Sequence, residues 1–214
     1  MKLYLSSYRL GNHPNKLKEL VGKTDAKVAV CMNALDYSND EARKEESLKN
    51  ELNDMKSLGF VPEQIDLRDY FDSGSVSDKL REYDAIWIRG GNTFILAKAF
   101  RQSGFDRAFN ELVVTNKLVY AGYSAAFCVL AVSLHGVELV DDKDAEAEHY
   151  KSGEIWAGLG AIDFYPIVHF RSNHHESDDV EKEYEYVIQK SLPHKTFKDG
   201  DVYVVNDSSQ QSLN

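Results

Sequence analysis

The feature that most constrains the fold is a repeated alternation of short apolar runs with longer amphipathic segments. The short runs are rich in β-branched and aromatic residues, and the longer segments have helical periodicity. This alternation is typical of a mostly parallel sheet with helices on both faces. A domain usually takes about 100–200 residues, so the 214 residues favour one domain. We therefore predict a single α/β domain over residues 1–214.

Strands are expected where uninterrupted apolar residues reach strand length, and helices where apolar residues recur every three or four positions. The predicted strands cover residues 28–32, 84–88, 118–121, 165–169 and 202–205. The predicted helices cover residues 39–58, 93–102, 124–134 and 177–190, the first with a capping box of Ser38 and Glu41. Because ligands bind at the carboxyl ends of strands in such sheets, we expect the chemistry directly after strands.

The composition excludes several classes of protein and partner. With 43% apolar and 11% aromatic residues, the chain is globular rather than disordered or fibrous. Its 25 basic and 35 acidic residues disfavour binding to the phosphates of nucleic acids. No run reaches the roughly 18 apolar residues that a membrane span needs, and Cys31 and Cys128 are expected as buried free thiols in a reducing compartment. We expect a cytoplasmic monomer or homodimer without nucleic-acid or membrane partners.

Ser124 is the strongest candidate nucleophile, because Gly122-Tyr123-Ser124-Ala125-Ala126 lies directly between a predicted strand and a predicted helix. Such a tight turn lifts a serine hydroxyl to the edge of the sheet, and small neighbours let the backbones approach. The N-terminus of the following helix points free amides at the serine, so the Ala125 N–H is suitably placed to stabilise an oxyanion. An ordinary N-capping serine is the competing interpretation.

A second turn, Gly90-Gly91-Asn92-Thr93, follows the predicted strand that ends at Ile88. Paired glycines between a strand and a helix expose backbone N–H groups, as half of an oxyanion hole or a phosphate cradle requires. The turn has neither the lysine nor the spacing of a P-loop. Its significance comes from its position at the end of another strand, on the same edge of the sheet.

A serine hydroxyl needs a base that takes its proton, and His169 is the best placed of the seven histidines. It ends an apolar run downstream of the serine, although a buried structural histidine would give the same pattern. A metal site formed by His169, His174 and His175 is disfavoured, because adjacent histidines in a loop lack a recognised ligand spacing.

The base in turn needs an acid that orients its ring. Asp199 and Asp201 both precede the predicted strand 202–205, and either is within reach of a histidine at the edge of the sheet. Acids in the run 138–148, such as Asp141, are further candidates. The sequence leaves this choice open.

The order and spacing of these motifs resemble the dipeptidase E family of serine peptidases, which are relatives of cyanophycinase. The resemblance spans about residues 28–205, and Gly90-Gly91-Asn92-Thr93-Phe94 is its most distinctive piece. It implies a three-layer α/β/α sandwich of the class I glutamine amidotransferase-like type. It also implies a serine acyl-enzyme mechanism and no cofactor.

By position, the resemblance assigns roles to individual residues. Ser124 matches the nucleophile, His169 the base and Asp199 the acid. The amides of Gly91 and Ala125 match the oxyanion hole. Gly90, Asn92 and Arg171 are further candidates for substrate binding, and no residue is assigned to a metal.

Two departures from the family pattern bear on activity and specificity. The family elbow reads Gly-x-Ser-Ala-Gly, whereas Ala126 occupies the last position here. Aspartyl dipeptidases of the family carry a Gly-Glu-Thr-Arg-Glu segment after the histidine. The corresponding stretch 176–181 of this chain is acidic and contains no arginine. Arg171 is the only cation nearby. Because the acidic stretches 138–148 and 176–185 bracket His169, the sequence predicts a cleft that prefers neutral or basic substrates.

The sequence therefore predicts a serine hydrolase, a dipeptidase- or exopeptidase-like enzyme that cleaves small peptides or isopeptides. The alternative is a catalytically weak or inactive family member that binds a ligand or partner in the same cleft. A glutamine amidotransferase is disfavoured, because that reaction needs a cysteine at the elbow and Cys128 lies one helical turn beyond it.

Overall fold

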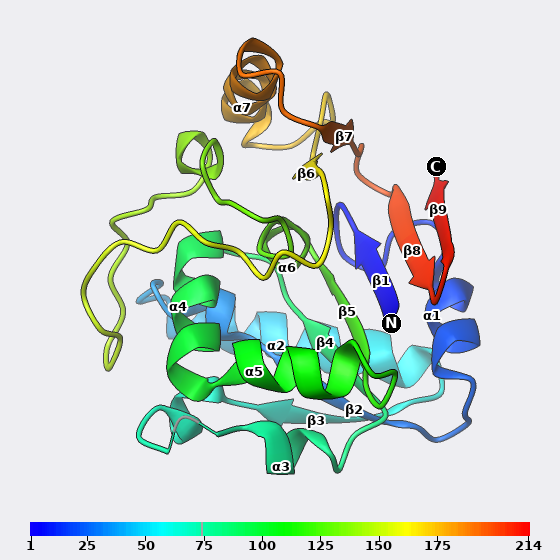
Figure 1. The fold of residues 1–214 in the computed structure, drawn as a ribbon. Coiled ribbons are helices and arrows are strands. Elements are labelled where there is room, and N and C mark those ends of the chain that lie inside the picture. The colour runs from blue at the N-terminus through cyan, green and yellow to red at the C-terminus, as the bar shows by residue number, and fades with distance from the viewer. Residues whose placement is uncertain (74) are drawn as a thin grey trace.

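A seven-stranded sheet runs through the middle of the computed structural model, which describes residues 1–73 and 75–214 (Figure 1). The strands from β3 to β1 are parallel, and β8 and β9 extend the sheet as antiparallel strands. In spatial order the strands are β3 (Val61–Ile65), β2 (Lys27–Cys31), β4 (Ala85–Ile88), β5 (Val119–Tyr123), β1 (Lys2–Ser6), β8 (Val202–Asn206) and β9 (Ser209–Leu213). The mostly parallel sheet predicted from the sequence is confirmed.

Helices cover both faces of this sheet, as the alternation of strand residues requires. On β1, Leu3 and Leu5 pack toward one face and Tyr4 toward the other. The helices α1 (Pro14–Val21) and α2 (Glu41–Ser57) cover the Tyr4 face. The opposite face carries α3 (Ser77–Leu80), α4 (Thr93–Ser103), α5 (Phe105–Ala108) and α6 (Ala125–Cys128), with short helical turns η1 (Asn33–Leu35), η2 (Leu67–Tyr70), η3 (Phe109–Val113) and η4 (Val137–Leu139) between elements. The fold is a three-layer α/β/α sandwich.

A smaller unit lies beyond the carboxyl ends of the parallel strands, at the top of Figure 1. It contains β6 (Tyr165–Ile167), which pairs with β7 (His194–Thr196) in a second, two-stranded sheet, and α7 (Ser177–Gln189). We call it the α7 unit. The predicted strand 165–169 is therefore shorter and belongs to a second sheet. His169 has a left-handed φ of 56°, which is incompatible with continuing the extended strand.

The predicted helix 124–134 is also shorter in the structure, because α6 ends at Cys128. The carbonyl oxygens of the following residues accept hydrogen bonds from a distant loop rather than from the next helical turn. The Leu159 N–H donates to Val129 at 2.8 Å, and the Ala161 N–H donates to Leu130 at 2.8 Å. Cys128 and Cys31 are buried and free, as predicted.

The remaining predicted helices agree closely with the structure, except at one cap. The predictions 93–102 and 177–190 correspond to α4 and α7 within one residue. The predicted capping box of Ser38 and Glu41 is wrong, because Asp40 is the N-cap of α2 and accepts the Arg43 N–H at 3.0 Å. Ser38 Oγ instead accepts the Asp40 N–H at 3.3 Å.

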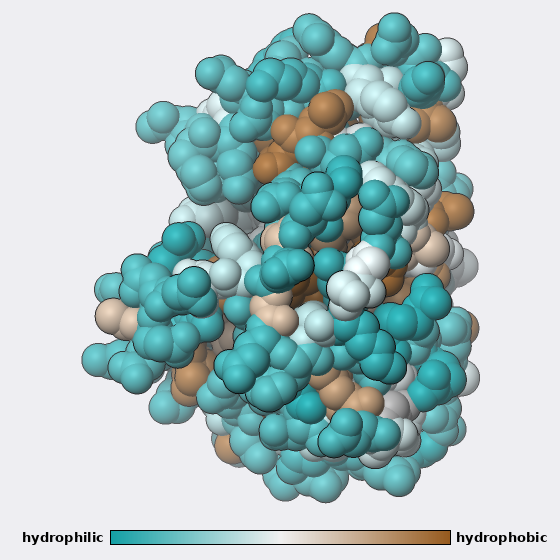
Figure 2. Space-filling view, turned by 90° about the vertical axis from the view of Figure 1, so that its left-hand side faces the viewer, coloured by the Kyte–Doolittle hydropathy of each residue, from teal (hydrophilic) through white to brown (hydrophobic). Residues whose placement is uncertain are grey.

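The exterior of the molecule is predominantly polar on the face that lies to the left in Figure 1. A space-filling view of this face shows hydrophilic side chains with apolar ones in small, separate patches (Figure 2). None of the helices formed by residues 1–73 and 75–214 combines the length and the apolar character needed to cross a bilayer.

The α7 unit contains one buried acid. Glu183 is 4% exposed and lies near the carboxylates of Glu138, Asp141 and Glu176. Burial, together with repulsion from these three groups, raises the pKa of Glu183 to about 8. A carboxyl group that is protonated in the folded protein but ionised in the unfolded chain makes stability fall as pH rises.

We expect the free energy of unfolding to fall between about pH 5 and pH 8, with Glu183 contributing up to about 1.4 kcal/mol per pH unit. Glu183→Gln removes the titrating group, so this variant should be more stable than the native protein at pH 8. Near pH 5 the free energies of unfolding of the two proteins should differ less. Urea unfolding followed by circular dichroism measures the effect. Glu185→Gln, on the exposed face of the same helix, is the matched control. An unchanged pH dependence in Glu183→Gln would contradict the prediction.

Candidate active site

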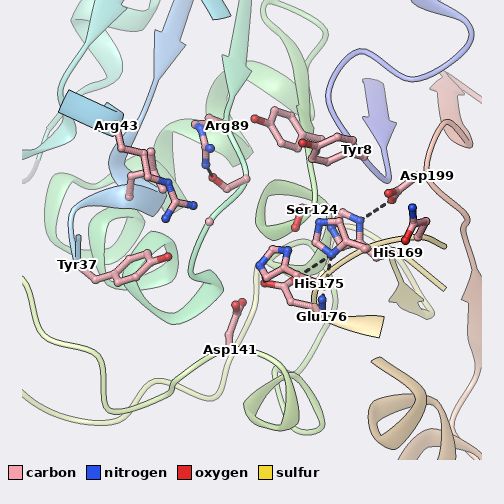
Figure 3. Close-up of a pocket in the computed structure, with 16 residues that line it drawn as sticks. Tyr8, Tyr37, Arg43, Arg89, Ser124, Asp141, His169, His175, Glu176 and Asp199 are labelled. Carbon is pink, nitrogen blue, oxygen red and sulfur yellow. Dashed lines mark hydrogen bonds and ion pairs between the residues drawn. The ribbon is translucent and has the colours of Figure 1, made fainter. Parts of the chain in front are cut away.

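A pocket of about 320 Å³ lies where the parallel strands β1, β2, β4 and β5 end, and residues of the loop between β6 and α7 line it as well (Figure 3). Segments far apart in the sequence form its wall, because the carboxyl ends of parallel strands meet at one edge of the sheet. The lining residues are Tyr8, Leu35, Tyr37, Arg43, Arg89, Gly90, Gly91, Tyr123, Ser124, Asp141, His169, Asn173, His174, His175, Glu176 and Asp199. The pocket therefore lies directly after strands, which is where the sequence analysis looked for a site.

Ser124 occupies a sharp turn between β5 and α6. Its backbone has φ 52° and ψ −112°, a conformation that is strained for any residue except glycine. Its side chain makes no capping hydrogen bond to α6, which contradicts the interpretation as an ordinary N-cap. A strained serine between a parallel strand and a helix has the geometry of a nucleophile elbow.

Ala126 fits the elbow because of the glycine four residues before it. A Cβ atom on Gly122 would lie 2.6 Å from the Ala126 Cβ and 2.5 Å from the carbonyl oxygen of Ile88. Gly122 therefore leaves the room that the Ala126 methyl group fills. The Tyr120 hydroxyl, on β5, donates to the Ala126 carbonyl oxygen at 2.8 Å and so links the strand to the start of α6.

His169 and Asp199 form a hydrogen-bonded pair in the wall of the pocket. The Nδ1 atom of His169 lies 2.6 Å from an Asp199 carboxylate oxygen, and the His169 side chain is 2% exposed. The His169 backbone N–H donates to Ser7 Oγ at 2.8 Å, and the Asp199 N–H donates to Ser172 Oγ at 2.8 Å. The pair is thus held both to the end of β1 and to the loop after β6.

Two of the other acids that the sequence left open as partners of His169, Asp201 and Asp141, have different contacts. The Asp201 carboxylate accepts the Lys198 N–H at 2.7 Å. The Asp141 carboxylate accepts the Thr93 N–H at 2.8 Å, at the start of α4. Among the three, Asp199 is the acid that contacts the His169 ring.

The amides of Gly91 and Ala125 lie on the turns that follow β4 and β5. Gly91 has a φ of 152°, and a Cβ there would lie 2.4 Å from the Ala34 carbonyl oxygen, so only glycine fits. Gly90 packs against the turn that carries Ser124, because a Cβ on Gly90 would lie 2.8 Å from Ser124 Cβ. Neither the Gly91 nor the Ala125 N–H donates to another group in the described part of the chain. Gly91 lines the pocket, whereas Ala125 is buried and is not among the lining residues.

Of the residues considered for substrate binding, Gly90 lines the pocket, whereas Asn92 and Arg171 do not. Asn92 is buried at the start of α4, where its side chain accepts the Ile95 N–H at 2.9 Å and donates to the Asp142 carbonyl oxygen at 2.8 Å. Arg171 is exposed and pairs with Glu181 at 2.8 Å.

Two arginines in the pocket were missed by the sequence analysis. Arg43 reaches the pocket from α2 and forms no ion pair with any other described residue. Arg89 is largely buried and lies 3.9 Å from Glu51, and its Nε has no hydrogen-bond partner among residues 1–73 and 75–214. The prediction that Arg171 is the only cation near the site is wrong. The position of Arg89 directly after a predicted strand could have identified it, whereas no sequence signal marks Arg43.

The two acidic stretches contribute little of their charge to the pocket. Only Asp141 from the first stretch and Glu176 from the second line it. Burial raises the pKa of Asp141 to about 6, partly offset by its hydrogen bond from Thr93. Because Arg43 and Arg89 line the pocket together with these acids, the preference for neutral or basic substrates stays a prediction that the charge of the pocket alone does not decide.

A metal ion is not favoured by the arrangement of the side chains. Among the described residues, His169, His174 and Glu176 form the one group of metal-type ligands within 4.8 Å of one another. The two imidazole rings, however, are parallel within 5° at a centroid distance of 3.8 Å. Ring nitrogen lone pairs lie in the ring plane, so two parallel rings cannot both direct a lone pair at one ion.

Comparisons with known proteins match this chain to peptidases. The model of "Peptidase family S51" matches residues 13–212. The uncharacterized peptidase Lmo0363 of Listeria monocytogenes is 28% identical over 120 residues, which is 55% of either chain. The uncharacterized peptidase PM1590 of Pasteurella multocida is 27% identical over 95 residues, which is 44% of either chain. This chain spans about half the length of the curated relatives it matches.

Two solved structures have the same fold over the whole chain. A candidate peptidase E protein from Listeria monocytogenes EGD-e superimposes with a TM-score of 0.76 at 18% identity, covering 100% of this chain and 98% of that one. A peptidase from an acI-B1 Actinobacterium gives a TM-score of 0.70 at 15% identity, covering 100% of this chain and 87% of that one. At these identities the likeness bears on the fold alone.

Proposed function

Because the chain belongs to peptidase family S51, whose model matches residues 13–212, we propose that it is a serine peptidase acting on short peptides or isopeptides. In this proposal Ser124 is the nucleophile, His169 is the general base and Asp199 orients the base. The observation that carries the proposal is the 2.6 Å contact of Asp199 with His169 Nδ1 in the same pocket as the strained Ser124. This contact leaves Nε2 of His169 free to take a proton.

The proposed reaction proceeds by acylation and deacylation. Ser124 Oγ attacks the carbonyl carbon of the scissile bond while its proton passes to His169 Nε2. The Gly91 and Ala125 amides stabilise the oxyanion, and His169 then protonates the leaving amine as the carbon–nitrogen bond breaks. Water attacks the acyl-enzyme with His169 again as base, which releases the acid product and restores Ser124.

The reaction requires the Ser124 hydroxyl to approach the His169 ring. Within the described residues, Ser124 Oγ makes no hydrogen bond to a histidine. Catalytic hydrogen bonds often form only when substrate is bound. Ser124 follows the main sheet and His169 follows β6 of the α7 unit, so we propose that movement of the loop after β6 on substrate binding brings the two side chains together.

The charges of the pocket support a short peptide with both ends free as substrate. Arg43 and Arg89 lie on the side of Ser124 away from His169, and Asp141 and Glu176 lie on another side (Figure 3). A guanidinium group pairs with a carboxylate, and a carboxylate pairs with an α-ammonium group. At about 320 Å³ the cavity is at the lower end of the range for ligand pockets, which suits a dipeptide or tripeptide.

We expect a fluorophosphonate probe to label the native protein at Ser124 and Ser124→Ala to lose the label completely. Asp199→Asn should slow labelling by about 10²–10⁴-fold, because a triad without its acid holds the wrong tautomer of the base. Mass spectrometry of the labelled peptide and the labelling rate provide the measurements.

Asp201→Asn is the matched control for the labelling experiment. It removes an acid two residues away whose carboxylate contacts a backbone amide instead of His169, so its labelling rate should stay within about twofold of native. A folded native protein that resists the probe at every pH would contradict the proposal. It would favour the alternative, a family member that only binds a ligand in this pocket.

We expect free dipeptides to be hydrolysed faster than the same dipeptides with a blocked end. N-acetylation removes the group that Asp141 and Glu176 would bind, and C-terminal amidation removes the group that Arg43 and Arg89 would bind. Either change should lower kcat/KM by about tenfold or more, as loss of a buried charged contact does. Product release is followed by chromatography.

Arg43→Ala provides the control that assigns the carboxylate contact. In this variant, the kcat/KM values of free and amidated dipeptides should differ less than they do with the native protein, because one of the two guanidinium groups is gone. Blocked and free dipeptides cleaved equally well by the native protein would exclude recognition of free ends. Such a result would leave the serine mechanism intact.

A further inference from the structure

A second imidazole lies flat against the candidate base. The rings of His169 and His174 stack with 3.8 Å between their centroids and 5° between their planes. Tyr8 meets both rings edge-on, at centroid distances of 5.8 Å and 5.6 Å. Asp199 contacts Nδ1 of His169, so the stack and the edge-on contact with Tyr8 both restrain the tilt of the ring about that hydrogen bond.

The hydrogen bonds and burial of His174 keep its ring neutral. Its Nδ1 accepts the backbone N–H of Glu176 at 3.4 Å, which assigns the ring proton to Nε2. The side chain is 12% exposed, and burial, together with the adjacent His169, lowers the pKa of His174. Near neutral pH the stack therefore contains at most one charged ring.

The charged groups around His174 come from three segments. The Glu176 carboxylate lies 3.5 Å from Nδ1, on the same loop as His175. The Asp199 carboxylate, on the loop before β8, attracts a proton on His174 electrostatically. On the side of β1, Arg9 lies over the Tyr8 ring at 5.7 Å. The two carboxylates favour protonation of His174, but burial and the two neighbouring histidines outweigh them, since the net direction of the pKa is downward.

We propose that His174 is a positioning residue whose neutral ring supports the imidazolium that His169 becomes when it takes the Ser124 proton. This inference rests on the proposed serine peptidase mechanism. An aromatic face attracts a cation that lies against it, and here the attraction exists only while His169 is charged. It therefore stabilises the transition state more than the resting enzyme. The proton moves between Ser124 Oγ and His169 Nε2 alone, and none passes to His174.

Two substitutions separate this role from simple packing. His174→Phe keeps an aromatic face without a titrating group, whereas His174→Leu keeps a similar volume without the face. If the ring only fills space, the two variants behave alike. If the ring supports a cation, loss of the aromatic face removes that support and slows the step in which His169 is charged.

The experiment measures the second-order rate of fluorophosphonate labelling from about pH 4.5 to pH 9, where the acidic limb reports the protonation of His169. We expect His174→Phe to keep the native midpoint of this acidic limb and a labelling rate within about twofold of native. His174→Leu should move the midpoint about half a pH unit lower and slow labelling about three- to tenfold. A ¹⁵N NMR titration of the His169 ring reads the same midpoint without the probe.

His135→Leu is the matched control, because His135 also stacks on an aromatic ring, Trp156 at 4.3 Å and 13°, but does not line the pocket. It should leave the midpoint and the rate unchanged. Coincident midpoints in His174→Phe and His174→Leu would overturn the role of His174, while loss of label in Ser124→Ala would still uphold the proposed function. If the native protein is not labelled at any pH, the proposed function fails and the role of His174 fails with it.

Discussion

The close approach of β4 and β5 at their carboxyl ends is the constraint on which the geometry of the pocket depends. A Cβ on Gly122 would collide with Ile88 of β4 and with Ala126 of α6, and a Cβ on Gly90 would collide with Ser124. Because these glycines have no side chains, two strand ends and the start of a helix pack directly on one another. The turn that carries Ser124 is strained, and this dense packing of buried backbone holds it in place.

Most of the main sheet could be predicted from hydrophobic periodicity, because β2, β4, β5 and β8 are short apolar runs buried on both faces. Prediction failed where tertiary contacts decide the local structure. The helix predicted over 124–134 ends at Cys128, since the next carbonyl groups bond to residues 159–162. The strand predicted over 165–169 ends early and leaves the main sheet, since its partner is β7. Neither partner is visible in the local pattern.

The candidate site shows the same division between local and distant information. Ser124 and His169 could be singled out because each directly follows a strand-like run. Asp199 and Asp201 are equivalent in the sequence, and the turn between them decides which carboxylate faces the His169 ring. Arg43 on α2 could not be predicted as a pocket residue, because charged residues are common on helix surfaces. Only the fold places Arg43 at the pocket. Whether these residues act as proposed remains a prediction.

The candidate nucleophile Ser124 and the candidate base His169 lie on segments that contact different apolar clusters, although Val168, next to His169, belongs to the main core. Ser124 follows the main sheet, whereas the loop of His169 continues from β6, where Ile167 packs with Val180 and Val187 of α7. Ser7 Oγ, which accepts the His169 N–H, is one link between the two parts. Substitutions on the face of α7 that packs on Ile167 can therefore reshape one wall of the pocket, while most of the core beneath Ser124 is formed by other elements. This division gives the chain a route by which substrate preference can evolve with little loss of folding stability.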